Sequence, residues 1–254
     1  MNRWLAKTIQ RLIRPRVTSS RIDCLFQKVR RRSFRIFYSS KDGYFSQAGQ
    51  DRFLNEVVFK GRKSGIFVEI GAAEGITFSN TYFFEKELGW SGVCVEPMPE
   101  AFSKLIAARK CRCVQACVTD FSGTGVFLAV DGVPTLSGLV SKYDPKHVQR
   151  VQREAAASGE HTRELQVTCS TFDELMEQSG LQHIDYLSID TEGGELDLLK
   201  TINFERFSIK VVSVENNFGD GRFEVTMSNI GYELVAVIGD DDIYLRQEAS
   251  RSPR

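Results

Sequence analysis

The sequence predicts an α/β fold with a seven-stranded, mostly parallel sheet and helices on both faces. From Tyr44 onward, short apolar runs alternate with amphipathic stretches of helical length, the order typical of parallel sheets covered by helices. The first run, residues 66–70, ends in a glycine turn at 71–75, and the second ends at Glu96. Glu96 follows Gly71 by 25 positions, near the roughly 20-residue spacing of a doubly wound sheet.

The remaining elements follow from the same alternation. Strands are expected at residues 66–70, 92–96, 112–118, 184–190, 211–215, 232–237 and 243–246. Helices are expected at residues 51–58, 78–88, 99–108, 171–178, 195–201 and 222–230. Pro99 suits a first helical turn, and Ser170 or Thr171 suits a helix cap. A further strand-like run at 165–169 is expected to return the chain to the core.

The 254 residues leave room for one such domain and extensions. We expect a basic N-terminal extension at 1–43, the main domain at 44–248 and a C-terminal tail at 249–254. Within the domain, residues 131–163 break the alternation with glycines, prolines and a polar run. This stretch is interpreted as an insertion that covers a substrate, or alternatively as a surface loop.

Charge is balanced overall but unevenly distributed. The first 40 residues carry a net charge of +10 and the remainder −10. Residues 4–13 place apolar side chains at helical spacing among cations, which suits peripheral contact with an anionic membrane. A solvated or partner-docked extension is the alternative we favour, and a nucleic-acid arm is disfavoured by the acidic main domain. No apolar run is long enough to span a bilayer, so a cytoplasmic protein is expected.

The six cysteines show no paired C-x-x-C spacing, and the chain has only three histidines. We therefore interpret the cysteines as reduced thiols in or near the core and disfavour a structural zinc site. His147 and His161 lie in the insertion, where each is a candidate base or a solvated side chain. His183 precedes a strand and is expected to be structural or exposed, and residues 240–242 are expected to form a hairpin turn.

The composition of the glycine turn narrows the choice of cofactor. No P-loop motif is present, and Ala72 and Ala73 stand where a dinucleotide site needs its second glycine. The acidic neighbours Glu69 and Glu74 favour a ligand with an ammonium or sulfonium cation, a description that S-adenosylmethionine fits. A plain strand-to-helix turn without a ligand is the alternative.

Several motifs together resemble the FkbM-type methyltransferases. They are Ser46-Gln47-Ala48-Gly49-Gln50-Asp51, Glu69-Ile70-Gly71-Ala72 with Gly75, Ser79-Asn80-Thr81, Gly89-Trp90-Ser91-Gly92, Glu96-Pro97, Asp190-Thr191-Glu192-Gly193 with Glu195, and Glu215-Asn216. They occur in the family's order from about residue 44 to residue 246. The resemblance implies a Rossmann-like class I methyltransferase fold and an S-adenosylmethionine-dependent O-methyltransferase. Its expected acceptor is a hydroxyl of a saccharide, glycolipid or natural-product-like molecule.

The resemblance also implies a cofactor site. Its residues would be Gln47, Gln50, Asp51, Glu69, Gly71, Ala72, Gly75, Ser79, Asn80, Glu96, Pro97 and Asp120. In it, Glu96 would bind the ribose, the 46–51 stretch would lie over the amino-acid end, and Asp120 would accept from the adenine amine.

Acidic residues after the fourth and fifth strands are the candidates for chemistry. Asp190 is the preferred base or metal ligand, with Glu192 two residues later. Asp190, Glu215 and Asn216 offer oxygens for Mg²⁺. Alternatively, these groups only orient substrate hydroxyls, or Glu195 acts on its helix through the dipole. Two competing functions stay open: a non-catalytic cofactor-binding scaffold and a nicotinamide-dependent oxidoreductase.

Overall fold

A computed structural model describes residues 31, 33–36, 42–130, 137–143, 148–149, 151, 153 and 161–247 of the chain. Several predictions fall outside these residues. They are the amphipathic helix at 4–13, His147, most of the insertion at 131–163 and the C-terminal tail.

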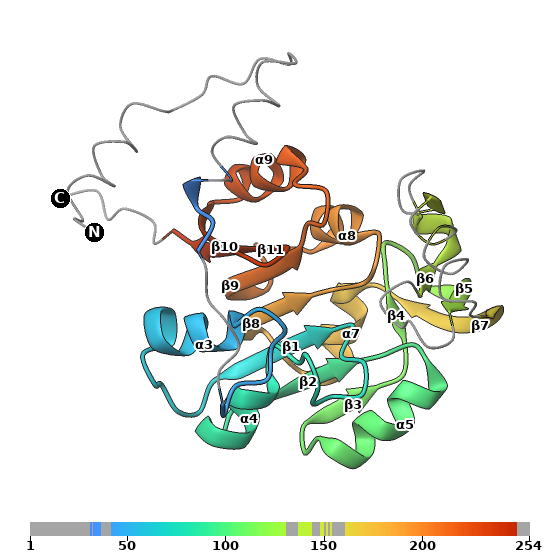
Figure 1. The fold of residues 1–254 in the computed structure, drawn as a ribbon, viewed down its shortest axis with the longest axis horizontal. Helices are drawn as coiled ribbons and strands as arrows, with labels where there is room; N and C mark the ends of the chain where they lie inside the picture. Colours follow the sequence, from blue (N-terminus) through green and yellow to red (C-terminus); the bar gives the residue numbers. More distant parts are fainter. Residues whose placement is uncertain are drawn as a thin grey trace.

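The main sheet has seven strands in the order β10-β11-β9-β8-β1-β2-β3 (Figure 1). Its strands are β1 (Ile66–Ile70), β2 (Ser91–Val95), β3 (Arg112–Val114), β8 (His183–Ile189), β9 (Ser208–Glu215), β10 (Tyr232–Ile238) and β11 (Asp241–Arg246). Pairing is parallel from β3 across to β9. The hairpin β10–β11 is antiparallel and joins β9 in antiparallel fashion. The predicted α/β fold is confirmed, with a sheet that is parallel in its larger part only.

Helices cover both faces of this sheet, as predicted. They are α3 (Gln50–Phe53), α4 (Tyr82–Leu88), α5 (Pro99–Ala108), α7 (Phe172–Ser179), α8 (Glu195–Thr201) and α9 (Gly221–Asn229). A π-helical turn, Leu54–Phe59, continues α3. Side chains of α7, α8 and α9 share one buried cluster, and those of α3, α4 and α5 share another. Among the described residues, no helix is long and apolar enough to cross a membrane.

Alternation along the strands builds the two clusters. Val68 and Ile70 of β1 face the first cluster, whereas Phe67 faces the second. On β8, Leu187 and Tyr186 divide in the same way, and the Tyr186 hydroxyl is satisfied by Ser213 Oγ at 2.8 Å. Burying each such side chain contributes about 1.5–3 kcal/mol, so both faces of the sheet contribute to the hydrophobic core.

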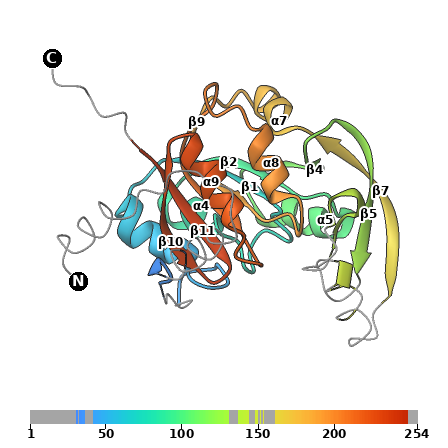
Figure 2. The ribbon, with the colours of Figure 1, turned by 90° about the horizontal axis from the view of Figure 1, so that it is seen from above.

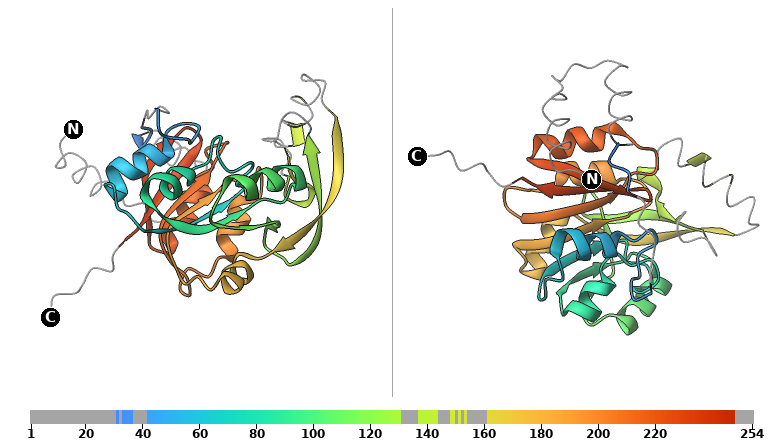
Figure 3. Two further views of the ribbon diagram at one scale, coloured as in Figure 1. Left: turned by 90° about the horizontal axis from the view of Figure 1, so that it is seen from below. Right: turned by 60° about the vertical axis from the view of Figure 1, so that its left-hand side comes forward.

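A second sheet of four strands, in the order β4-β7-β5-β6, was not predicted. Its strands are β4 (Cys117–Val118), β5 (Gly123–Val130), β6 (Gly138–Leu139) and β7 (Thr162–Ser170). The strand predicted at 112–118 is wrong in extent, because β3 ends at Val114 and the chain then enters β4. The run at 165–169 belongs to β7, which pairs with β5 from residue 162 to residue 169. Figures 2 and 3 show β5 and β7 as a long ribbon at one side of the main sheet.

Part of the predicted N-terminal extension packs on the main domain. Ile36 N and Phe34 O bond to Val237 O and Val237 N, each at 2.9 Å, so this short piece lies along β10, the outer strand of the sheet. Arg31 Nε contacts Asp242 Oδ1 at 2.6 Å, and the Asp242 side chain is 2% exposed. The N-terminal segment is therefore anchored through both backbone and charge.

Two helix starts agree with the predicted signals, and one does not. Thr171 and Glu174 form a reciprocal capping box at α7, and Pro99 is the first residue of α5. The helix predicted to begin at residue 78 begins instead at Tyr82. Phe78 has φ of 63°, a left-handed conformation that no helix continues through.

Candidate active site

Polar residues gather where the parallel strands end. Gly71 follows β1, Glu96 follows β2, Asp190 follows β8 and Glu215 ends β9. Asp190 N donates to Ile70 O at 3.0 Å, so β1 and β8 stay paired to their last residues. A Cβ at Gly71, whose φ is 83°, would lie 1.7 Å from Asp190 O. Only glycine fits there, which explains the strand-to-glycine pattern in the sequence.

The turn after Gly71 is fixed against β2. Gly71 N and Ala72 N both donate to Val95 O at 3.0 Å, and Gly75 N donates to Ala72 O at 2.9 Å. Ala73 adopts a left-handed φ of 46°, and its N–H points to Glu96 Oε2 at 2.9 Å. The predicted cofactor residues Gly71, Ala72 and Gly75 thus form one tight turn over the end of the sheet.

Glu96 lies beside this turn, at the position predicted for a ribose carboxylate. Its other oxygen accepts from Met98 N at 2.9 Å, across Pro97. The side chain is buried, and burial raises the pKa of Glu96 to about 7 although the two N–H groups oppose the shift. Both oxygens keep further lone pairs, which the hydroxyls of a ligand can use.

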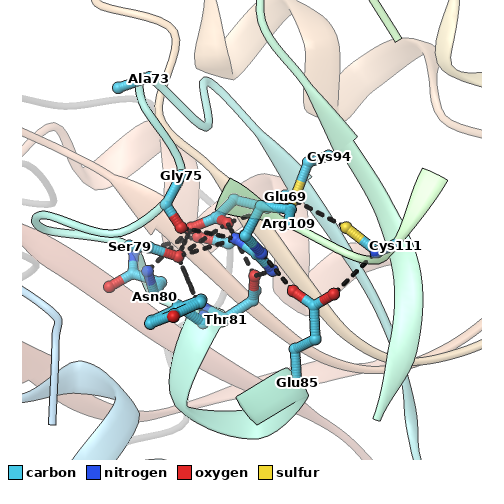
Figure 4. Close-up of polar contacts among 12 residues, drawn as sticks. Glu69, Ala73, Gly75, Ser79, Asn80, Thr81, Glu85, Cys94, Arg109 and Cys111 are labelled. Atoms are coloured by element: carbon cyan, nitrogen blue, oxygen red, sulfur yellow. Dashed lines mark hydrogen bonds and ion pairs between the residues drawn. The ribbon is translucent and has the colours of Figure 1, made fainter. Parts of the chain in front are cut away.

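Beneath the turn lies a closed network around Glu69 (Figure 4). Its carboxylate accepts from Ser79 Oγ at 3.0 Å, Asn80 N at 2.8 Å and Thr81 Oγ1 at 2.7 Å. Arg109 Nη1 donates to the same carboxylate at 3.1 Å. Glu69 and Ser79, which were predicted as cofactor residues, therefore hold the segment between the glycine turn and α4 against β1. Because residues 79–81 make these bonds, the helix begins only at Tyr82.

Arg109 is the centre of the network and was not predicted. Its side chain is fully buried and also contacts Glu85. The Arg109 guanidinium also donates to Gly75 O at 3.1 Å and to Thr81 Oγ1 at 2.8 Å. One cation between two carboxylates thus connects β1, the glycine turn and α4. The sequence shows Arg109 only as the start of the basic run Arg109-Lys110-Cys111-Arg112, in which nothing local indicates burial.

A second polar group adjoins the turn on the side of β11. Asp241 Oδ2 accepts from Gln50 Nε2 at 3.1 Å and lies 3.5 Å from Asn80 Nδ2. Burial is the main cause that raises the pKa of Asp241 to about 7. Asn80 Oδ1 is buried and has no hydrogen-bond partner within the described part of the chain. The turn predicted at 240–242 is wrong for Asp241 and Asp242, which are buried residues of β11.

The 46–51 stretch is joined to the segment between the glycine turn and α4 by a backbone bridge between Ser46 and Phe78. Asp51 is fully buried and accepts from Phe45 N at 2.7 Å and from Ser46 N at 3.2 Å. Burial raises the pKa of Asp51 although these bonds oppose the shift. Asp51 thus shapes this turn, Gln50 reaches Asp241, and Gln47 is exposed.

Three carboxylates converge after β8 and β9. One oxygen each from Asp190, Glu192 and Glu215 lies within 4.8 Å of the others. Burial raises the pKa of Glu215 well above its ordinary value, and the next causes are the charges of Asp190 and Glu192. Glu192 has a left-handed φ of 55°, a strained conformation of the kind that concentrates at functional sites.

Asn216, the third predicted metal ligand, faces other groups. Its Nδ2 donates to Asp242 Oδ2 at 2.8 Å, and its Oδ1 accepts from Asp220 N at 2.7 Å. Glu195 shapes the loop before α8, because it accepts from Thr191 N at 3.1 Å and Gly193 N at 2.8 Å. Of the predicted metal ligands, Asp190 and Glu215 therefore lie together, with Glu192 beside them. The third, Asn216, bonds to Asp220 and Asp242 instead.

A shallow pocket lies next to this loop. It is lined by Cys117, Val118, Thr119, Leu139, Lys142, Thr191, Gly193 and Gly194. Lys142 Nζ bonds to Asp120 at 2.6 Å and lies 3.5 Å from Asp197, and this contact lowers the pKa of Asp120. The carboxylate predicted to meet adenine is therefore paired with a lysine. Residues 137–143 of the insertion lie over the Thr191–Gly194 loop, since Lys142 Cβ is 3.2 Å from a Cβ built at Gly194.

The described histidines lie outside this arrangement. His183 begins β8 at the opposite edge of the sheet, with a side chain that is 55% exposed and 3.3 Å from Asp185. His161 is exposed at the start of β7. Neither adjoins the carboxylates of Asp190, Glu192 and Glu215.

Comparison with known proteins gives a domain match and likenesses to solved structures. Residues 69–236, about two thirds of the chain, match the methyltransferase FkbM domain. No curated protein matches the chain. The crystal structure of methyltransferase FkbM from Methylobacillus flagellatus KT is similar at 10% identity with a TM-score of 0.45, over 72% of this chain and 43% of that one. By its domain match, the chain belongs to the FkbM methyltransferase family.

Proposed function

We propose that the protein is an S-adenosylmethionine-dependent O-methyltransferase that acts on a hydroxyl of a saccharide, glycolipid or natural-product-like acceptor. The observation that carries this proposal is the convergence of Asp190, Glu192 and Glu215 beside the glycine turn. Glu96, which could accept from ribose hydroxyls, and several carboxylates lie at the same end of the sheet, which supports a reaction between a cationic cofactor and a neutral hydroxyl.

The residues around the turn suit S-adenosylmethionine. The buried acceptor Asn80 Oδ1 and the carboxylate of Asp241 suit the ammonium of its amino-acid part. Glu96 suits the ribose hydroxyls. When bound, this cofactor supplies an electrophilic methyl group on its sulfonium. Aligning the acceptor oxygen behind that methyl, with water excluded, gives much of the acceleration.

The carboxylates then have a single task, which is to remove the hydroxyl proton. A carboxylate whose pKa is raised by burial and by like charges is a better base near neutral pH. Asp190 remains the preferred base, and it adjoins Glu192 and Glu215, of which Glu215 has a pKa raised in this way. The same three oxygens also suit part of the octahedral shell of Mg²⁺, and a divalent ion held there would lower the pKa of the acceptor hydroxyl.

Two measurements test the proposal. Calorimetric titration should show binding of S-adenosylmethionine and no binding of NAD, because Ala72 and Ala73 replace the second glycine of a dinucleotide site. Glu96→Ala should weaken that binding by at least about tenfold through loss of the ribose contact. NAD binding would favour the oxidoreductase, and binding of neither would reject both.

The catalytic step is tested by transfer of labelled methyl groups to a panel of glycans and glycolipids, with Mg²⁺ or with EDTA. Asp190→Asn should lower transfer by about 10²–10⁴-fold, the usual contribution of a general base. Asp197→Asn, an exposed carboxylate on α8, is the matched control and should keep full activity. Cofactor binding without transfer to any acceptor would favour the non-catalytic scaffold.

A further inference from the structure

Two cysteine thiols meet at the edge of the Glu69–Arg109 network. Cys94 Sγ on β2 lies 3.5 Å from Cys111 Sγ, in the segment that leads into β3 (Figure 4). Cys94 is fully buried and Cys111 is half-buried. The backbone at Cys111 is held in place, since its N–H donates to Glu85 Oε1 at 2.7 Å. Cys94 is thus held in a strand and Cys111 by its backbone bond to Glu85, with the two sulfurs on opposite sides of a short gap.

We propose that Cys94 and Cys111 form an oxidation-sensitive pair, in which Cys111 attacks a peroxide and Cys94 closes a disulfide. The present sulfur separation is one of van der Waals contact, and a disulfide needs about 2.0 Å. The thiols already face each other, so the proposal requires the two side chains and the bend at Cys111 to bring the sulfurs together. This modification site is independent of the methyl transfer proposed above.

The surroundings assign the two roles. Cys111 is the more accessible thiol, and its contact with Cys94 and the charge of Arg109 lower its pKa. Burial raises the pKa of Cys94 instead, and the Cys94 S–H also faces Glu69 Oε2 at 3.6 Å. The thiolate is the form that reacts with peroxide, so oxidation begins at Cys111.

The chemistry balances with hydrogen peroxide as the oxidant. The Cys111 thiolate attacks one peroxide oxygen, which gives a sulfenic acid and releases hydroxide. The Cys94 sulfur then attacks the Cys111 sulfur, the S–O bond breaks, and a second hydroxide leaves. With the two thiol protons these hydroxides become two waters, and two electrons pass from the thiols to the peroxide.

Neighbouring thiols supply the controls. Cys113 is the parallel-sheet partner of Cys94 by register, but its thiol points to Cys111 O at 3.6 Å, and its pKa is raised to about 12, mainly by burial. Cys117 and Cys169 are register partners in the second sheet, and both are buried. Cys24 lies outside the described residues and is replaced by serine in every protein tested.

Tryptic mapping after peroxide treatment identifies the partner of Cys94. Trypsin cleaves after Lys110 and Arg112, so Cys111 and Cys113 fall into different peptides, while Cys94 is the single cysteine of the peptide at 87–104. We expect the peptide at 87–104 linked to the dipeptide Cys111-Arg112. A link to the peptide at 113–142, or no link while the protein is folded, would overturn the proposal.

Variants test the order of the two steps. Cys94→Ala should leave a sulfenic acid at Cys111 that dimedone traps, and Cys111→Ser should abolish the link. Cys113→Ser should leave the link intact. In the reduced protein, iodoacetamide should label Cys111 at least about tenfold faster than Cys113. Equal labelling of the two, or dimedone on Cys94 in place of Cys111, would contradict the assigned roles, and neither readout depends on methyl transfer.

Discussion

The buried carboxylates beneath the glycine turn and those at the ends of β8 and β9 have opposite electrostatic surroundings. Glu69 and Glu85 share the cation Arg109, and hydroxyls and backbone N–H groups complete the network. Glu215 is half-buried, and after burial the groups that raise its pKa most are the carboxylates of Asp190, Glu192, Glu195 and Asp241. The carboxylates of the first group have a cation and hydrogen-bond donors within the protein, whereas those of the second group gain from a proton or an external cation.

This difference distinguishes the carboxylates that stabilise the fold from those suited to take part in the reaction. Carboxylates that already have a cation and hydrogen-bond donors in the protein gain little from a ligand, so their role is to fix the position of the turn above them. Crowded carboxylates have raised proton affinity, the property expected of groups that accept a proton or bind a cation. The acidic residues of the sequence motifs thus have two different roles: some, such as Glu69, hold the backbone in place, and others, such as Glu215, are suited to bind a proton or a cation. The motifs alone do not show which residue has which role.

Removal of Arg109 should have the largest effect on stability. Arg109→Met leaves Glu69 and Glu85 buried without their cation, which we expect to lower the free energy of unfolding by about 3–5 kcal/mol. Urea unfolding measures this change. The control is Arg206→Met, whose ion pair with Glu177 joins side chains that are 46% and 51% exposed, and it should cost less than about 1 kcal/mol. Equal small losses in both variants would mean that the network does not hold the turn.

The pH dependence of stability should show the titration of Glu96. Its folded pKa of about 7 lies above the ordinary 4.5, so between these values the unfolded chain loses its proton first and stability falls as pH rises, then levels off above 7. Relative to the wild type, Glu96→Gln should gain on the order of 2–3 kcal/mol between pH 4.5 and pH 8.

Urea unfolding at several pH values measures that gain. The comparison across pH removes any constant cost of placing an amide opposite Ala73 N and Met98 N. Glu100→Gln, at an exposed carboxylate paired with Arg163, should show almost no pH-dependent difference from the wild type. A parallel pH profile for Glu96→Gln and the wild type would mean that Glu96 titrates normally.

The smallest effect is expected at the crowded carboxylates. Glu215→Gln removes one of several like charges, so it should raise the free energy of unfolding by about 1 kcal/mol at pH 8, since a raised carboxylate pKa penalises the folded state above it. Methyl transfer should fall in the same variant. The exposed Glu205→Gln should change neither quantity. A stability loss at Glu215 would mean that its charge is compensated in the protein.

The parallel sheet and its glycine turn are predictable because their signals are local. The apolar run before Gly71, the proline at residue 99 and the carboxylate at residue 96 each indicate their structure within a few residues. The second sheet is not predictable in this way. Its strand β5 begins at Gly123 and includes Gly125, and it pairs with a strand that lies beyond the insertion.

The residues of the candidate site likewise differ in whether a local sequence signal predicts their position. The positions of Gly71, Glu96 and Asp190 at strand ends follow from the strand pattern. The burial of Arg109 and Asp241 does not, because each stands in a run of like charges that is typical of solvent-exposed segments. Only the packing of distant elements brings Arg109 to Glu69 and Asp241 to Gln50.

The backbone contact of residues 34–36 with β10 has a practical consequence for truncated proteins. β10 is an outer strand, and Val237 uses its N–H and C=O on Phe34 and Ile36. A chain shortened to begin at Tyr44 would present these groups to solvent, and Asp242 would lose Arg31. Bare strand edges template edge-to-edge association between molecules, so such a protein should aggregate at concentrations at which the full chain stays dispersed.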